Sequence, residues 1–246
     1  MSDLLQSYPR QRPPLGPEYQ AVFLEEYRAN REGTGAILAM VKNLESWMHR
    51  RVASMSGGRC LELGAGTLNH VPYEPKAEEY DVVEPMTALL DGSAFRSRVR
   101  DAYLSVADVP AERRYDRVLS IAALEHMVDL PHDVAQATRR LEPEGVFQAA
   151  IPSEGGFLWG FSWRTTTGVG YWLRHRLNYA AVMRHEHINT APEILSVVRY
   201  FYGDVRLRRF PTPIHHLSFY TYIEARVPRY DRVETYFRDR EAGAAS

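Results

Sequence analysis

The chain has 246 residues, of which 45% are apolar and 25% are charged, and its formal net charge is -1. This composition is typical of a globular chain that is long enough to form a full hydrophobic core. The near-zero charge excludes a general attraction to nucleic acid or to a membrane surface. The single cysteine, Cys60, excludes internal disulfides.

No charged-then-apolar leader begins the sequence, and no apolar run reaches the ~20 residues of a membrane helix. We therefore expect a cytoplasmic protein without stable membrane insertion. Residues 8–17 are rich in proline and should run over the surface. Between Glu18 and Met55 apolar residues recur close to a helical period, with a break at residues 33–35, which predicts two helices.

A glycine turn placed directly after a short apolar strand is the most informative motif. Residues 59–63 form the predicted strand, and Gly64 and Gly66 follow it, with Glu62 just before the turn. Glycines here permit a sharp strand-to-helix turn and let a ligand approach the backbone. A second predicted strand ends at Glu84, about 20 residues after the turn, which is the spacing of an acid that binds ribose hydroxyls. Together the two features predict a nucleoside-cofactor site.

These motifs resemble those of the class I S-adenosylmethionine-dependent methyltransferases, whose first motif is acid-x-Gly-x-Gly-x-Gly and whose second strand ends in a ribose-binding acid. Glu62, Gly64 and Gly66 match the first motif, and Glu84 matches the acid. The third glycine of the family pattern falls on Leu68, where we expect ordinary helical or extended backbone angles. The resemblance implies S-adenosylmethionine as the cofactor. The residues expected to contact it are Glu62, Gly64, Ala65, Gly66, Thr67, Glu84, Pro85, Met86, Asp108, Ala122, Tyr27 and Arg28.

Some of these residues have a second interpretation. Tyr27 and Arg28 could close over the donor, with Arg28 near its carboxylate, or could belong to an ordinary packing helix. Asp101 and Asp108 are the candidates for binding the adenine amino group, and a solvated turn is the alternative for both.

A nicotinamide dinucleotide site is one alternative to the methyltransferase. It requires Gly or Ala at the sixth position of G-x-G-x-x-G, where this chain has Asn69, and no Tyr-x-x-x-Lys pair lies near the expected cleft. An NAD(P)-dependent oxidoreductase is therefore disfavoured. A regulatory protein that binds the cofactor without catalysis is the other alternative, favoured by Leu68 and opposed by the intact Glu62 and Glu84.

Two further segments extend the resemblance, which covers residues 55–155. Residues 114–131 are similar to the family's fourth strand and the turn after it, where Leu124-Glu125-His126 resembles the small-molecule branch that includes ubiquinone-type O-methyltransferases. Residues 141–152 fit the end of a helix, a turn and the fifth strand. The resemblance implies an α/β fold with a Rossmann-like doubly wound sheet of seven strands, mostly parallel with an antiparallel last strand, and an N-terminal helical cap. We divide the chain into an N-terminal arm with cap helices (1–55), a cofactor-binding core (56–154), an aromatic lid or substrate insertion (155–190) and a closing helix and strands (191–246).

The segment after the fifth strand is unusually aromatic. Rings over residues 157–173 could form a lid over the cleft, could fill a core, or could contact a membrane surface. Polar groups then gather before a predicted helix that Thr190 caps. The candidate acceptor-binding residues are Trp159, Trp163, Arg184, His185 and Asn189.

Methyl transfer to a hydroxyl group benefits from a base of near-neutral pKa, and histidine is the usual choice. We expect His126 or His187 to act as this base, although either ring could instead be structural. His185 and His187 stand two residues apart without a partner cluster of ligand spacing, so the sequence predicts no metal site.

Between Arg164 and Arg209 the positive side chains outnumber the acids, which either favours an anionic acceptor or marks a solvated face. Interleaved acids elsewhere leave no continuous basic track for nucleic acid. We therefore predict O-methylation of a small-molecule acceptor, with anionic metabolites and sugars among the candidates, and leave open whether the protein is an oligomer.

Overall fold

The computed structural model describes residues 3–22 and 36–244. Its strands are β1 (Gly58–Leu63), β2 (Ala77–Val83), β3 (Ala102–Tyr103), β4 (Tyr115–Ile121), β5 (Leu141–Pro152), β6 (Tyr202–Pro211) and β7 (Ser218–Pro228). They form one seven-stranded sheet in the order β3-β2-β1-β4-β5-β7-β6. β7 runs antiparallel to β5 and β6, and the remaining neighbouring strands run parallel. The predicted seven-stranded sheet, mostly parallel with an antiparallel last strand, is confirmed.

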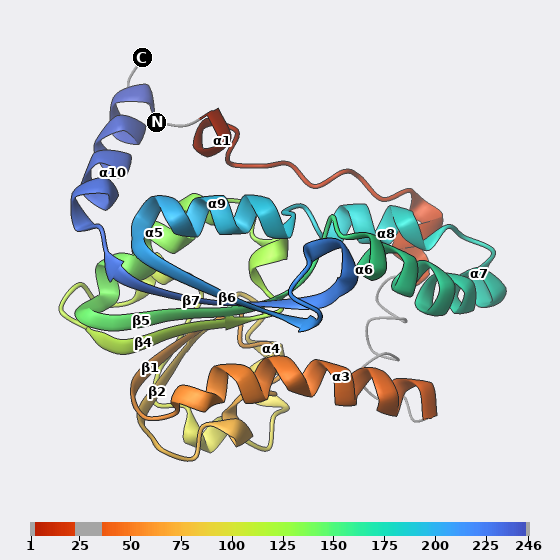
Figure 1. The fold of residues 1–246 in the computed structure, drawn as a ribbon, viewed down its shortest axis with the longest axis horizontal. Helices are drawn as coiled ribbons and strands as arrows, with labels where there is room; N and C mark the ends of the chain where they lie inside the picture. The colour runs from red at the N-terminus through yellow and green to blue at the C-terminus, as the bar shows by residue number, and fades with distance from the viewer. Residues whose placement is uncertain (1–2, 23–35, 245–246) are drawn as a thin grey trace.

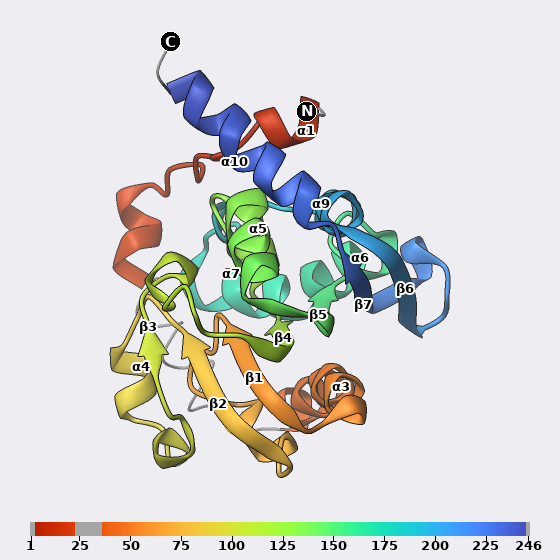
Figure 2. The same ribbon diagram turned by 90° about the vertical axis from the view of Figure 1, so that its left-hand side faces the viewer.

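Helices cover both faces of this sheet (Figure 1). The described α-helices are α1 (Asp3–Gln6), α3 (Ala36–Val52), α4 (Ala88–Asp91), α5 (Leu130–Arg140), α6 (Phe157–Trp163), α7 (Val169–His175), α8 (Tyr179–Glu186), α9 (Ala191–Phe201) and α10 (Tyr230–Ala244). Residues 17–22 are also helical. α3 and α4 pack on one face, and α5, α9 and α10 pack on the other (Figure 2). None of the described helices is long and apolar enough to cross a membrane.

Burial on both faces explains the apolar sequences of the central strands. Cys60, Leu61 and Leu63 of β1 are fully buried, and so are Val118 and Leu119 of β4. Parallel strands covered by helices on both sides read as nearly continuous apolar runs, because neither face meets water. Because β2, β1 and β4 are parallel neighbours, their carboxyl ends lie at the same edge of the sheet.

The helix predicted after Thr190 is present as α9. Thr190 and Glu193 form a capping box, in which the backbone N–H and the hydroxyl of Thr190 both donate to Glu193 Oε2. These bonds satisfy groups that the first helical turn leaves unpaired. The predicted Thr190 cap is confirmed.

The N-terminal arm follows the predicted surface path. Residues 7–16 run from α1 along α9 toward α8 (Figure 1). The Tyr8 hydroxyl donates to Asn189 Oδ1 at 2.7 Å, and Arg10 pairs with Glu193 at 2.6 Å. Arg12 then donates to the backbone carbonyl of His126 at 2.9 Å. The arm thereby brings a cation to the carboxyl edge of the sheet.

Candidate active site

The turn after β1 needs glycine for geometric reasons. Gly64 and Gly66 have φ angles of 70° and 52°, in the left-handed region that disfavours side chains. A Cβ atom at Gly64 would lie 2.4 Å from the Cβ of Ala123, closer than two such carbons can approach. The turn after β1 therefore sits directly against the turn after β4.

The backbone conformation of Leu68 differs from the one expected from the sequence. Its φ is 65°, so the ordinary helical or extended angles expected there are wrong. The side chain is fully buried in the cluster that includes Val71 and Leu90. This packing holds a left-handed conformation that costs an L-residue roughly 1–2 kcal/mol. The loop keeps a glycine-like backbone at the position where the family pattern has glycine.

The carboxylate of Glu84 connects the first two strand ends. Glu84 Oε2 accepts a hydrogen bond from the backbone N–H of Gly66 at 2.7 Å, and Oε1 accepts one from the N–H of Met86 at 2.9 Å. The residue is only 6% exposed. A buried carboxylate held by two amide donors is a fixed acceptor at the edge of the glycine turn.

Glu62 lies deeper, below the same turn. Its side chain is buried, and Glu62 Oε2 accepts a hydrogen bond from the Tyr80 hydroxyl at 2.8 Å. Burial raises the pKa of Glu62 to about 7, despite the opposing effects of His70 and of the Tyr80 hydrogen bond. The site therefore holds a carboxylate whose charge is poorly solvated, and a cationic ligand group would stabilise the ionised form.

A cavity of about 700 Å³ lies over these groups, a size that suits a cofactor. Nine residues predicted to contact the cofactor line it, namely Glu62, Gly64, Ala65, Gly66, Thr67, Glu84, Pro85, Met86 and Ala122. Ala122 follows β4 and has a φ of 51°, again in the left-handed region. The structure thus brings three separate sequence motifs to one cavity.

Among the described residues, the two predicted adenine-binding acids, Asp101 and Asp108, do not line this cavity. Asp108 is exposed, and its Oδ2 accepts hydrogen bonds from the backbone N–H and the hydroxyl of Ser105, which cap a short 3-10 turn. Ser105 itself lines the cavity, between Leu104 and Val106. Asp101, the other candidate for adenine, pairs with Arg113. Tyr27 and Arg28 lie outside the residues that the structure describes.

A second cavity, of about 510 Å³, adjoins the first. The two cavities share Glu45, Met48, Ala122 and His126 in their linings. The predicted residues Trp159, Trp163 and His187 line the second cavity. α6 and the π-helical segment Arg164–Gly168 contribute much of its wall, so the aromatic segment after β5 borders a cavity next to the glycine turn.

Three predicted acceptor-binding residues lie outside both of these cavities. Asn189 is fully buried, and its Nδ2 donates to the carbonyls of Leu124 and Met127, while its Oδ1 accepts from Tyr8. Through these hydrogen bonds Asn189 connects the turn after β4 to the N-terminal arm. His185 Nδ1 donates to the carbonyl of Pro13 at 2.7 Å, on the side of α8 that faces the arm. Arg184 is exposed.

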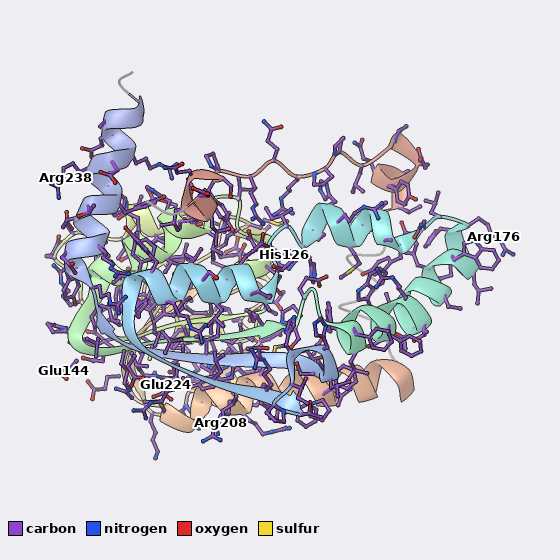
Figure 3. All side chains as sticks on the ribbon, turned by 45° about the horizontal axis from the view of Figure 1, so that its top comes forward. His126, Glu144, Arg176, Arg208, Glu224 and Arg238 are labelled. Carbon is purple, nitrogen blue, oxygen red and sulfur yellow. The ribbon has the colours of Figure 1, made fainter. Side chains whose placement is uncertain are left out.

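His126 and His187 come together at the boundary of the two cavities. Their ring centroids are 4.8 Å apart in an edge-to-face arrangement. His126 Nδ1 lies 2.9 Å from the carbonyl oxygen of Glu186, and His187 Nδ1 lies 3.0 Å from Glu154 Oε2. His126 lies near the junction of the sheet with the α6–α8 segment (Figure 3).

Sequence reasoning missed several residues at the cavities. Arg12 lines the first cavity, and Glu45 and Met48 of α3 line both. The helical period around Glu45 predicted a helix, but it did not predict which face of that helix lines the cavities. Arg12 gave no signal, because its place depends on contacts of the arm with segments more than a hundred residues away in sequence.

No protein-family model matches the sequence, and no curated protein matches it significantly. Solved structures do resemble it. A methyltransferase of Thermotoga maritima, described as S-adenosylmethionine-dependent and a possible histamine N-methyltransferase, superposes with a TM-score of 0.58 and 14% identity over 85% of this chain and 98% of that chain. The N-methyltransferase NodS of Bradyrhizobium japonicum in complex with S-adenosylhomocysteine gives 0.54 and 11% identity, over 87% of this chain and 100% of that chain.

The CurJ carbon methyltransferase gives a TM-score of 0.56 and 17% identity, over 87% of this chain and 62% of that chain. This chain has the fold of the class I S-adenosylmethionine-dependent methyltransferases. At such low identities the likeness shows the fold alone. The solved structures named here include an N-methyltransferase and a carbon methyltransferase, so the class I fold does not decide the acceptor of this chain.

Proposed function

We propose that the chain is an S-adenosylmethionine-dependent methyltransferase whose small-molecule acceptor binds in the second cavity. The observation that carries this proposal is the shared wall of the two cavities, formed by Glu45, Met48, Ala122 and His126. A donor in the first cavity and an acceptor in the second would meet there. Bound S-adenosylmethionine supplies an electrophilic methyl group, and the protein has to align the reactants and exclude water.

The residues of the first cavity suit this cofactor. Glu84 is a buried acceptor beside the glycine turn, as a ribose diol requires, and the left-handed Gly64 and Gly66 leave the backbone open to a ligand. Glu62 would ionise more readily beside the positive charge of the methionine moiety. The Leu104–Val106 segment offers apolar surface and backbone polar groups to the adenine ring.

The second cavity favours an acceptor with a flat apolar body and a hydroxyl group. Its wall contains Trp159, Trp163 and Tyr220, together with a short run of threonines at 165–167. The part of that wall that the structure describes includes no lysine or arginine. We therefore propose O-methylation of a neutral acceptor, and the anionic acceptor expected from the sequence is not part of this proposal.

His187 or His126 would take the proton of the acceptor hydroxyl. Because carboxylate and carbonyl oxygens only accept hydrogen bonds, both Nδ1 atoms carry a proton, which leaves Nε2 as the basic nitrogen of each neutral ring. A methyltransferase that lacks this base would depend on acceptors that are already ionised.

The regulatory alternative loses its main support. It rested on the missing third glycine, and Leu68 adopts the left-handed conformation that glycine would. The cytoplasmic location, the four-part division of the chain, the absence of nucleic-acid partners and the oligomeric state stay predictions.

A transfer assay tests the proposal. Purified protein is incubated with methyl-labelled S-adenosylmethionine and a panel of neutral hydroxylated aromatic compounds, with anionic sugars and amines as comparison sets. We expect label transfer to a hydroxylated aromatic compound and its loss in a Trp163→Arg variant, which replaces an aromatic wall of the second cavity by a cation. Transfer only to anionic sugars or amines would overturn the proposed acceptor class. Transfer that persists in Trp163→Arg would overturn its proposed place.

A further inference from the structure

A cluster of potential metal ligands borders the second cavity. Glu125, His126 and His187 each offer one ligand atom, and these three atoms lie within 4.8 Å of one another. All three residues line the second cavity. The sequence alone predicts no metal site, because two of the three candidate ligands, Glu125 and His126, come from the turn after β4, far from His187 in the chain.

Both histidines are held in the tautomer that metal ligation requires. His187 Nδ1 donates to Glu154 Oε2, and His126 Nδ1 donates to the carbonyl of Glu186. The lone pair of each neutral ring is therefore on Nε2. A carboxylate or carbonyl that accepts from the distal ring nitrogen is the usual partner of a metal-bound histidine, since it orients the ring and increases its basicity.

Two carboxylates lie close to these rings. Glu154 Oε2 accepts hydrogen bonds from His187 Nδ1 and from the indole N–H of Trp159. Glu125 is 1% exposed, and its Oε2 has no hydrogen-bond partner among the residues described. A buried carboxylate oxygen without a partner is costly, and a bound cation would satisfy it.

We propose that Glu125, His126 and His187 bind one divalent transition-metal cation, of the Zn²⁺ or Fe²⁺ class, with its open coordination positions facing the second cavity. Two imidazoles and one carboxylate form a ligand set that these cations accept with positions left free for water or substrate. Glu154 is the positioning residue, because it fixes the His187 ring without contacting the cation.

The consequence for catalysis rests on the proposed function. A cation at this place would bind the acceptor hydroxyl and lower its pKa, and the proton would leave to water. The cation would then replace His187 or His126 in the part of the proposed function that removes this proton, because both Nε2 atoms would be bound to it. The site itself is independent of that consequence, and it is tested without cofactor or acceptor.

The test is calorimetric titration of chelator-treated full-length protein with ZnCl₂, together with the visible spectrum of added Co²⁺. We expect one cation per chain, and at least about tenfold weaker binding in His187→Ala and in Glu125→Gln. Glu154→Ala should weaken binding by roughly 10- to 100-fold and alter the Co²⁺ spectrum, because the His187 ring loses the acceptor that orients it. His185→Ala, which removes a neighbouring histidine outside both cavities, should bind as the wild type does.

Absence of Zn²⁺ binding would overturn the inference, and so would equal affinity in wild type, His187→Ala and Glu125→Gln. Titration with S-adenosylhomocysteine shows that each variant is folded, since neither His187 nor Glu125 lines the first cavity. If the wild type binds Zn²⁺ but not S-adenosylhomocysteine, the proposed function fails and the metal site stands. The converse result leaves the function and removes the metal site.

Discussion

His126 and His187 meet edge to face with ring centroids 4.8 Å apart, although one follows β4 and the other follows α8. These segments are distant in sequence, and the fold brings the two rings together where the first and second cavities adjoin. Replacing His187 by alanine should therefore lower kcat by roughly 10²- to 10⁴-fold, whether the ring acts as base or as metal ligand.

The same substitution should leave donor affinity unchanged, because His187 does not line the first cavity. Steady-state kinetics on the acceptor found in the transfer assay, with S-adenosylhomocysteine titration in parallel, separates the two effects. His185→Ala is the matched control and should keep full kcat. Unchanged turnover in His187→Ala would refute a catalytic role for this ring.

The buried Glu62 should make stability depend on pH. Burial raises its pKa to about 7 in the folded chain, from 4.5 when unfolded, so its ionisation opposes folding. Without ligand, the Glu62 contribution is fully present below pH 4.5 and is lost as pH rises through 7. Glu62→Gln keeps an acceptor for Tyr80 and carries no charge. This variant should gain up to about 3 kcal/mol over wild type at pH 8, and little at pH 4.

Urea unfolding at both pH values measures this difference, with Glu78→Gln as an exposed control on β2. Equal pH dependence in wild type and Glu62→Gln would show that Glu62 is solvated in the folded chain.

Leu68 should invert the usual order of alanine and glycine. Both Leu68→Ala and Leu68→Gly lose the buried side chain, but only glycine adopts φ of 65° without strain. We expect the glycine variant to be the more stable of the two by about 1 kcal/mol. Thermal unfolding of the pair measures this, and Leu61→Ala against Leu61→Gly in β1 should show the ordinary order. A less stable glycine variant at position 68 would contradict the left-handed turn.

A buried ion pair that involves a residue of β4 should be costly to break. Arg117 Nη1 pairs with Glu74 Oε2 at 2.8 Å, and both side chains are buried. Arg117→Ala leaves the buried Glu74 without its guanidinium partner, while His70 Nε2 stays 3.1 Å from its Oε1, and we expect a loss of about 3–5 kcal/mol in the free energy of unfolding. Arg59→Ala removes partly exposed pairs with Asp116 and Glu142 and should cost at most about 1 kcal/mol per pair. Similar losses in the two variants would show that burial does not make the Arg117–Glu74 pair more costly to break.

The features that were predicted correctly from the sequence are those that residues close together in the chain determine. The glycine turn and Glu84 are set by local spacing, and the cavity gathers them as expected. Leu68 differs because distant packing, and not residue type, holds its backbone angle. Asn189 and His185 lie in the polar stretch that suggested a site, yet sequence order does not show which side of α8 faces the cavity and which faces the N-terminal arm.

The helix α10 shows the same limit in the fold. Val233, Tyr236 and Phe237 pack with α5 and α9, and Arg240 pairs with Asp129 before α5. Many charged residues between these apolar positions conceal the helical period. Tertiary contacts, not local pattern, account for this last element.

Cofactor binding tests the central claim most directly. Calorimetric titration with S-adenosylmethionine, S-adenosylhomocysteine and NAD is made on wild type, on Glu84→Ala, and on Glu78→Ala, an exposed control in the same strand. We predict that the wild type and Glu78→Ala bind the first two ligands and not NAD, and that Glu84→Ala binds them at least about tenfold more weakly. Binding of NAD alone, binding of none of the three ligands, or equal affinity in Glu84→Ala would contradict the account.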